Sequence, residues 1–353
     1  MKIKITDIAK KANVSNTTVS LVLNNKPGVG SAKRRKILEI AKDLGYKTSK
    51  NGKNEYQNNK GIIKFYKISK HAHTVNRDHD VFLADYIIGL NQEAKRRNYV
   101  LEISDKVKIE SMKDIINSND VNRVSGIIVL GTELNYSDIE FFKSVNIPLG
   151  FIDTFFDFSD FDFVDMNNTS AVFKIIKYLV DSGHKNIGFI KANTDVRNFK
   201  LREVAFKEAL EFLNIKYSEK YIYSVDSTFT GSYNDMINII QKNAKFPTAL
   251  FSSNDIIAYG CIKALREYNY RIPEDISIIG FDDLPMSTLM DPSLTTYNVS
   301  KKHMGEASMN LMINRIEKNN LIPSKKVLIG GQLITRNSVK NIQRQSNSIS
   351  TSK

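Results

Sequence analysis

Three absences in the sequence exclude whole classes of protein. Cys261 is the single cysteine, so no disulfide can form within the chain, and a reducing compartment fits this composition. No run of apolar residues approaches the roughly twenty that a membrane-spanning helix needs. The N-terminal charges are not followed by the continuous apolar stretch of a secretory signal. We therefore expect a cytoplasmic protein without a membrane partner.

Motifs for catalysis and for cofactor binding are also missing. The sequence has no glycine-rich phosphate loop of the usual spacing and no Ser or Cys in a recognised nucleophile motif. His71, His73 and His79 share one polar loop and could bind a metal, but solvated histidines are the simpler interpretation. We expect no enzyme activity, no cofactor and no metal site.

Positive charge is concentrated at the N-terminus. The 353 residues carry a formal net charge of +13, and residues 1–60 contain 14 Lys and Arg against 4 Asp and Glu, so +10 lies there. A basic patch confined to a small terminal segment indicates a polyanionic partner, with DNA ahead of RNA and anionic membranes. The length of the chain predicts two or three domains.

Two short helical patterns fill the stretch TDIAKKANVSNTTVSLVLNN, residues 6–25. Thr6 can cap the first helix, Asn13 breaks it, and Ser15 can cap the second. Val14 and Val19 have the spacing of a hydrophobic staple across that second cap. A third amphipathic pattern follows, with the apolar residues Ile37, Ile40, Ala41 and Leu44. Three such helices can bury one small core.

The outer face of the second helix has the chemistry of a base reader. Stepping about 100° per residue turns Asn16, Thr17 and Leu21 toward this face. Asn16 can pair with adenine, Thr17 can contact bases or phosphate, and Leu21 can meet a thymine methyl group. A merely solvated face is the alternative, but helix, turn and helix suit a major groove. The side chains that can contact the phosphates of the DNA backbone are Lys10, Lys11, Lys33, Arg34, Arg35 and Lys36.

The stretch TDIAKKANVSNTTVSLVLNNKPGV resembles the N-terminal signature of the LacI/GalR family of bacterial transcription regulators. The resemblance implies a helix-turn-helix DNA-binding domain over residues 1–46. It also implies that Asn16, Thr17 and Leu21 read bases, whereas Ser15, Thr18 and Asn24 hold the DNA backbone or position the helix. The candidate DNA-binding residues are Thr6, Ser15, Asn16, Thr17, Thr18, Ser20, Leu21, Asn24, Lys33 and Arg34.

Residues 47–60 depart from the pattern of that family. The family usually continues with a Pro-Asn pair and a short helix whose leucine enters the minor groove and bends the DNA. Here the chain reads KTSKNGKNEYQNNK, with Glu55 in the place of the wedge and Tyr56 after it. This composition predicts a flexible polar linker, an atypical hinge that bends DNA less.

From residue 61 onward, short apolar runs alternate with amphipathic stretches, which is typical of βαβ units and parallel sheets. GIIKFYKI, YVLEIS, GIIVLG and PLGFID form a first series, and NIGFIKA, YIYSV, TALFSSN and SIIGFD form a second. Two such lobes place the carboxyl ends of their strands at a common cleft. Polar residues at these strand ends could bind a polyhydroxylated ligand or cap the following helices. They are Asp153, Asn254, Asp255, Asp282 and Asp283.

The motifs GFIDTFF, KLREVAFKEAL and IPEDISIIGFDD resemble the effector domain of the same family. The resemblance implies a two-lobed, periplasmic-binding-protein-like α/β domain over residues 61–340, used for effector binding and dimerisation. The chain would cross between lobes near Met166, Leu294 and Lys325, and residues 341–353 would form a disordered tail. The candidate effector-binding residues are Phe82, Asp153, Arg202, Asn254 and Asp282.

These features predict a sequence-specific DNA-binding transcriptional regulator, most simply a repressor that binds an inverted repeat as a homodimer. A small-molecule effector between the lobes would control it; sugars, sugar phosphates and nucleobases all remain open. A cytosolic solute-binding protein is an alternative that residues 1–46 oppose. An enzyme acting on sugars or nucleosides is a second alternative, opposed by the missing catalytic motif.

Overall fold

The computed structural model describes residues 3–23, 28–44, 46, 59–108 and 124–342. They form two compact units, residues 1–59 and residues 60–353. Most of the predicted linker at 47–60, Asn24 and nearly all of the tail at 341–353 lie outside the described residues.

The N-terminal unit is a three-helix domain built as the apolar pattern predicts. Its helices are α1 (Ile5–Ala12), α2 (Asn16–Leu23) and α3 (Ser31–Asp43). Ile8, Val19, Val22 and Ile37 are among the residues of its buried core, and Val14 packs against this core from outside. The Oγ of Ser15 accepts the Thr18 backbone N–H at 3.1 Å. The predicted cap of the second helix is therefore confirmed.

The predicted cap of the first helix is wrong. Helix α1 begins at Ile5, so Thr6 lies inside its first turn. The backbone N–H of Lys4 donates to Oδ2 of Asp7 at 2.7 Å, and the Asp7 N–H donates to the Lys4 carbonyl at 3.0 Å. A carboxylate in the first turn also interacts favourably with the positive helix end. Asp7, and not the hydroxyl of Thr6, thus fixes where the helix starts.

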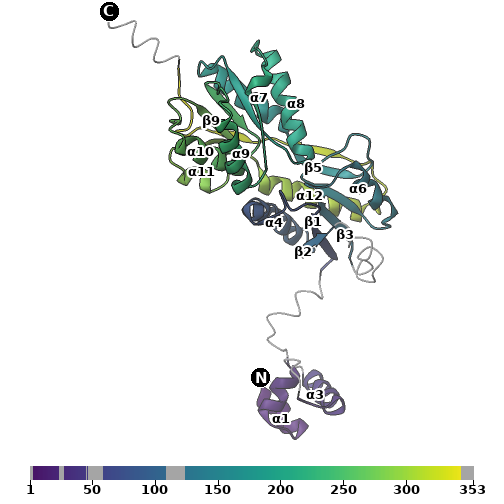
Figure 1. The fold of residues 1–353 in the computed structure, drawn as a ribbon. Helices are drawn as coiled ribbons and strands as arrows, with labels where there is room; N and C mark the ends of the chain where they lie inside the picture. Colours follow the sequence, from purple (N-terminus) through teal and green to yellow (C-terminus); the bar gives the residue numbers. More distant parts are fainter. Residues whose placement is uncertain (1–2, 24–27, 45, 47–58, 109–123, 343–353) are drawn as a thin grey trace, which may run out of the picture. The chain divides into compact units, whose positions relative to one another are not determined.

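The first lobe of the larger unit is a six-stranded sheet with the order β11-β5-β4-β3-β1-β2, in which all described pairings are parallel. The strands are β1 (Ile62–Ser69), β2 (Val100–Lys108), β3 (Gly126–Leu130), β4 (Leu149–Ile152), β5 (Asp162–Met166) and β11 (Lys326–Ile329). Its helices are α4 (Asp80–Arg96), α6 (Tyr136–Phe141) and α12 (Lys301–Glu317). Helix α12 packs along α4 and across β3, β4 and β5 (Figure 1).

The second lobe is a six-stranded sheet with the order β12-β10-β9-β8-β6-β7, in which β12 is antiparallel to β10 and the other described pairings are parallel. Its strands are β6 (Ile187–Ala192), β7 (Ile222–Val225), β8 (Ala249–Ser252), β9 (Ser277–Asp282), β10 (Thr295–Asn298) and β12 (Gln332–Ile334). Its helices are α7 (Asn168–Asp181), α8 (Arg197–Phe212), α9 (Phe229–Gln241), α10 (Asp255–Glu267) and α11 (Met286–Leu289). The two lobes have the predicted α/β architecture.

The chain passes between the lobes three times. The first passage follows β5 at Met166, where a crossing was expected. The second lies between β10 and α12, at residues 299–300, and the third lies between β11 and β12, at residues 330–331. Both lie a few residues beyond the expected Leu294 and Lys325, because β10 and β11 are complete strands that end before the chain leaves its sheet. No helix of the described residues is long and apolar enough to cross a membrane.

One buried carboxylate organises the loop after β1. Glu133 accepts the backbone N–H groups of Lys70, His71 and Ala72 on Oε2, and those of Thr74 and Val75 on Oε1. Burial alone would raise the pKa of Glu133, but these N–H donors outweigh that effect and hold its pKa at about 2. The loop that carries the predicted histidines therefore wraps around an anion supplied by the protein itself.

We predict that Glu133→Gln lowers the melting temperature, because a neutral amide cannot accept five backbone donors. The loss should be about 2 kcal/mol above pH 4.5. It should shrink as the pH falls toward 2, because a carboxylate with a depressed folded pKa stabilises the fold only while ionised. Thermal unfolding across this pH range measures it. The exposed Glu208→Gln is the control, and equal losses in both variants would contradict the account.

Candidate functional site

Two of the three predicted base-reading residues, Asn16 and Thr17, lie together on one face of the N-terminal unit, whereas Leu21 does not line the hollow there. Thr6, Asn16, Thr17 and Ser20 line a shallow hollow together with Tyr46. The side chains of Thr6, Ser15, Asn16, Thr17 and Lys33 are exposed, whereas Thr18, Ser20, Leu21 and Arg34 are half-buried. Leu21 is thus less exposed than its position on the outer face predicts. The surface offers amides, hydroxyls and nearby cations, which are the groups that contact base edges and phosphates.

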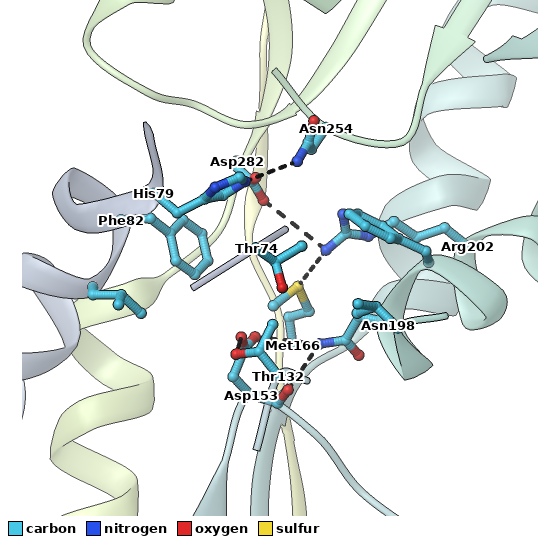
Figure 2. A pocket seen from close by; sticks show the side chains of 13 residues that line it. Thr74, His79, Phe82, Thr132, Asp153, Met166, Asn198, Arg202, Asn254 and Asp282 are labelled. Atoms are coloured by element: carbon cyan, nitrogen blue, oxygen red, sulfur yellow. Dashed lines mark hydrogen bonds and ion pairs between the residues drawn. The ribbon is translucent and has the colours of Figure 1, made fainter. Parts of the chain in front are cut away.

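The five predicted effector residues come together in the larger unit. They line one cavity between the lobes, shown in Figure 2. The lining residues are Thr74, His79, Phe82, Leu83, Thr132, Asp153, Met166, Val196, Asn198, Phe199, Arg202, Asn254 and Asp282. The cavity measures about 40 Å³, room for only a few water molecules. The side chains themselves therefore occupy most of the cleft.

Arg202 is the central cation of this cavity. It comes from α8 of the second lobe, and its guanidinium carbon lies 3.7 Å from the centre of the Phe281 ring. Its Nη1 donates to the Ser253 carbonyl at 2.6 Å, and its Nη2 lies 3.0 Å from Sδ of Met166, at the end of β5 in the first lobe. The Nε donates to Oδ1 of Asn168 at 2.9 Å. Arg202 thus spans the cleft without a close ion pair.

Asn198, which lies on α8 as Arg202 does, connects this helix to acidic residues of the first lobe. It lies one turn before Arg202, and its Nδ2 is 3.2 Å from Oδ1 of Asp153 and 3.1 Å from Oδ1 of Asp165. Its Oδ1 accepts the amide of Asn168 at 2.9 Å. Asp153 also accepts hydrogen bonds from Tyr86 and Thr132. Two groups of α8 therefore reach across the cleft to the first lobe: the Asn198 amide contacts the carboxylates of Asp153 and Asp165, and the Arg202 guanidinium contacts Met166.

Asp282 has a carboxylate that the protein leaves incompletely satisfied. Its Oδ1 is buried and has no hydrogen-bond partner among the described residues, and Nη2 of Arg202 lies 4.0 Å away. The backbone of Asp282 has φ 113°, a conformation that residues other than glycine rarely adopt. An unpaired buried acceptor is costly. This oxygen is therefore available to a donor from a ligand.

Burial dominates the ionisation of these groups. It raises the pKa of Asp153 to about 6 and that of Asp282 to about 7, although Arg202 counteracts it at both. Burial and the charge of Asp153 raise the pKa of Asp165 further above its usual value. The pKa of Arg202 is lowered by burial, against the pull of the carboxylates. The cavity thus holds more acid groups than cations and takes up protons near neutral pH.

The strand-end residues divide between the cavity and the framework. Asn254 caps α10 by accepting the Ile257 N–H at 2.9 Å, and its amide nitrogen lies 3.3 Å from Nε2 of His79 in the opposite lobe. Asp255 instead accepts hydrogen bonds from groups of the second lobe, including the Leu284 N–H at 2.9 Å. Asp283 forms an ion pair with Arg336 at 2.7 Å. The helix-capping interpretation therefore applies to part of this set.

Sequence reasoning missed several residues of the cavity, among them Thr74, Thr132 and Asn198. Asn198 had a usable signal, because it lies four residues before Arg202 and so shares its helix face. His79 lines the cavity, whereas the side chain of His71 lies beside Glu133 and that of His73 lies beside Asp226. No group of three or more potential metal ligands occurs in the part of the chain that the structure describes.

Six phenylalanines lie between residues 151 and 163, and most of them belong to the first-lobe core. Phe151 and Phe163 are buried there, and Phe155, Phe156 and Phe161 pack against them. Phe158 is exposed. None of the six lines the cavity between the lobes.

Two family models match the chain. The model described as bacterial regulatory proteins, lacI family, matches residues 4–49. The model described as a periplasmic binding protein-like domain matches residues 176–339. The first covers the three-helix unit, and the second covers the second lobe from within α7 onward, together with α12 and β11 of the first lobe.

Relatives of known function extend the match to nearly the whole chain. The HTH-type transcriptional repressor PurR of Haemophilus influenzae is 29% identical over 342 residues, which cover 96% of this chain and 99% of the relative. The repressor of the same name from Mannheimia succiniciproducens is 28% identical over 340 residues, with 96% and 99% covered. Both relatives are repressors.

Solved structures share the fold. The transcriptional regulator CelR in complex with cellobiose has a TM-score of 0.70 at 19% identity, covering 95% of this chain and 99% of that chain. The lac repressor dimer bound to operator and the anti-inducer ONPF also has a TM-score of 0.70, at 20% identity, covering 96% and 100%. With a lacI-type helix-turn-helix domain followed by a periplasmic-binding-protein-like domain, this chain belongs to the lacI family of bacterial regulatory proteins.

Proposed function

We propose that this protein is a cytoplasmic, sequence-specific repressor that binds an inverted-repeat operator as a homodimer and responds to a neutral, polyhydroxylated effector. One observation carries the proposal: all five predicted effector residues line a single cavity between the lobes. The base-reading face of α2 supports the DNA partner. Catalysis is not part of the proposal, because the relatives are repressors.

The polar lining of the cavity favours a ligand with several hydroxyl groups. Asp282 offers an unpaired buried acceptor, and Asp153, Asn254 and Arg202 offer further donors and acceptors nearby. Phe82 and Phe199 provide apolar faces for a carbon ring. Sugars bind to relatives of this fold, such as the CelR–cellobiose complex, and the same class suits this lining.

The balance of charge opposes a phosphorylated ligand. Asp153, Asp165 and Asp282 are all buried, and burial raises their pKa values. Arg202 is the one Lys or Arg that lines the cavity. A phosphate group would add negative charge where carboxylates already take up protons. The effector we propose is therefore an unphosphorylated sugar or a similar neutral molecule.

Binding of this effector requires the lobes to rearrange. The cavity of about 40 Å³, which Arg202 and Asn198 help to line, is too small for a sugar. A ligand would replace the contacts of Asn198 with Asp153 and of Arg202 with Met166 by contacts of its own. An effector changes DNA affinity only if it binds one arrangement of the lobes more tightly than the other.

The proposal predicts distinct effects for base-reading and phosphate-binding residues. Asn16→Ala or Thr17→Ala should cost roughly 1 to 3 kcal/mol at the matched operator and relax base preference, whereas Lys33→Ala should weaken all sequences alike. Quantitative footprinting on upstream regions measures both. Failure of the protein to protect any inverted repeat at low salt would refute the DNA partner.

The proposal also predicts that the cavity residues are needed for effector binding but not for effector-free repression. Arg202→Ala and Asp282→Asn should weaken binding of a neutral sugar at least tenfold while leaving effector-free operator affinity nearly unchanged. Calorimetry and operator titration on the same samples test this. Lys200→Ala is the control, because Lys200 is exposed on the same helix. Normal sugar affinity in both cavity variants would place the ligand elsewhere.

A thermal-shift screen separates neutral from phosphorylated ligands, since a ligand bound only by the folded state raises the melting temperature. The panel pairs each neutral sugar, including ribose and cellobiose, with a phosphorylated counterpart. We expect stabilisation by a neutral sugar and none by its phosphate ester at the same concentration. A larger shift with the ester would overturn the charge argument.

A further inference from the structure

Lys301 is a buried cation behind the cavity that the candidate site does not include. It is the first residue of α12 and only 6% exposed. It follows the second passage of the chain between the lobes, and α12 belongs to the first lobe. Buried lysines are rare unless their charge is compensated. Its contacts therefore indicate what it does.

The ammonium group of Lys301 contacts two residues of the cavity lining. Its Nζ donates to the backbone carbonyl of Asp282 at 2.5 Å, and it lies 5.2 Å from the centre of the Phe82 ring. Asp282 is at the end of β9 in the second lobe, whereas Phe82 is in α4 of the first. Lys301 thus joins residues of both lobes directly behind the cavity.

The helix that carries Lys301 is fixed in place. Helices α4 and α12 approach so closely that a Cβ atom at Gly89 would collide with the carbonyl of Lys302, and one at Gly305 would collide with the carbonyl of Tyr86. Because no side chain separates the two backbones there, the start of α12 has little room to shift. The lysine stem is therefore anchored, and its charge has a defined position.

The charge of Lys301 acts on Asp282 and lowers the pKa of its carboxyl group. The backbone of Asp282 at φ 113° needs support, and the carbonyl that Lys301 holds belongs to this residue. Arg202 and Lys301 are the cations that lower the pKa of its carboxyl, against burial and the charges of Asp255 and Asp153. His79 lines the same cavity. The guanidinium of Arg202 stacks on Phe281 and lies 4.0 Å from the carboxylate of Asp282. Lys301 is the second cation that acts on this carboxylate.

We propose that Lys301 is a positioning residue of the effector site, which holds Asp282 oriented and ionised so that its carboxylate can accept a ligand hydroxyl. The functional part of this inference rests on the proposed function. The electrostatic part does not, because it concerns Asp282 in the protein without ligand. Lys301 itself has no place in the cavity lining.

The test compares thermal unfolding of the full-length protein at pH 5.5 and pH 8.5, with no ligand added. A carboxyl group whose folded pKa is raised leaves the fold most stable at low pH and destabilises it as the pH rises through that pKa. Lys301→Met removes the cation and should raise the pKa of Asp282 further. The loss of melting temperature should be larger at pH 8.5 than at pH 5.5, by about 3 °C for one pKa unit.

Three further variants identify the cause. In the Asp282→Asn background, Lys301→Met should cost the same at both pH values, because no carboxylate remains to titrate. Lys301→Arg should retain the wild-type profile. Lys302→Met, at the exposed neighbouring lysine, should leave it unchanged. Any of four results would overturn the inference. The loss in Lys301→Met could be independent of pH, or its dependence on pH could persist in the Asp282→Asn background. Lys302→Met could have an equal effect, or Lys301→Met could fail to fold at pH 5.5.

Binding of a neutral sugar from the panel separates this inference from the proposed function. We expect Lys301→Met to weaken that sugar about tenfold at pH 7, with the difference shrinking at pH 8.5 and above, where Asp282 ionises in both proteins. If the unfolding profile behaves as expected but neither Asp282→Asn nor Lys301→Met changes sugar affinity, the electrostatic inference holds and the proposed ligand site fails.

Discussion

The burial of Arg202 among carboxyl groups is the constraint on which the cleft depends. Its guanidinium stacks on Phe281 in the second lobe and reaches Met166 in the first, while three carboxyl groups around it have raised pKa values. Burying charge without a close ion pair destabilises a protein more often than it stabilises one. Such a cluster persists where it performs a function, and here it leaves an acceptor on Asp282 that a ligand can satisfy.

The same cluster links ligand chemistry to the arrangement of the lobes. Asn198 and Arg202 line the cavity from one helix of the second lobe, and they contact residues at the strand ends of the first. A ligand that displaces them changes the contacts between two rigid bodies rather than one side chain. Because packed interfaces switch between discrete arrangements, a small molecule can produce a movement of the size that a DNA-binding dimer requires.

The sequence was informative where local chemistry dictates structure, and less so where distant segments meet. Apolar periodicity located the three N-terminal helices, and the Ser15 cap followed from its hydroxyl. The Thr6 cap failed because the helix begins one residue earlier, at Ile5, where the carboxylate of Asp7 accepts the Lys4 N–H. Strand ends pointed to Asp153 and Asp282, yet Asn198 and Lys301 matter through residues far away in the chain. No local pattern distinguishes Lys301 from the exposed Lys302 beside it.

Reciprocal titration of the wild-type protein tests the central claim most directly. The operator dissociation constant is measured with and without a saturating neutral sugar, and the sugar dissociation constant is measured with and without saturating operator. Linkage requires both ratios to be the same factor, and the account predicts a factor of about 5 to 150. A sugar that binds in the cavity, as judged by its loss in Arg202→Ala, but leaves operator affinity unchanged would contradict the account.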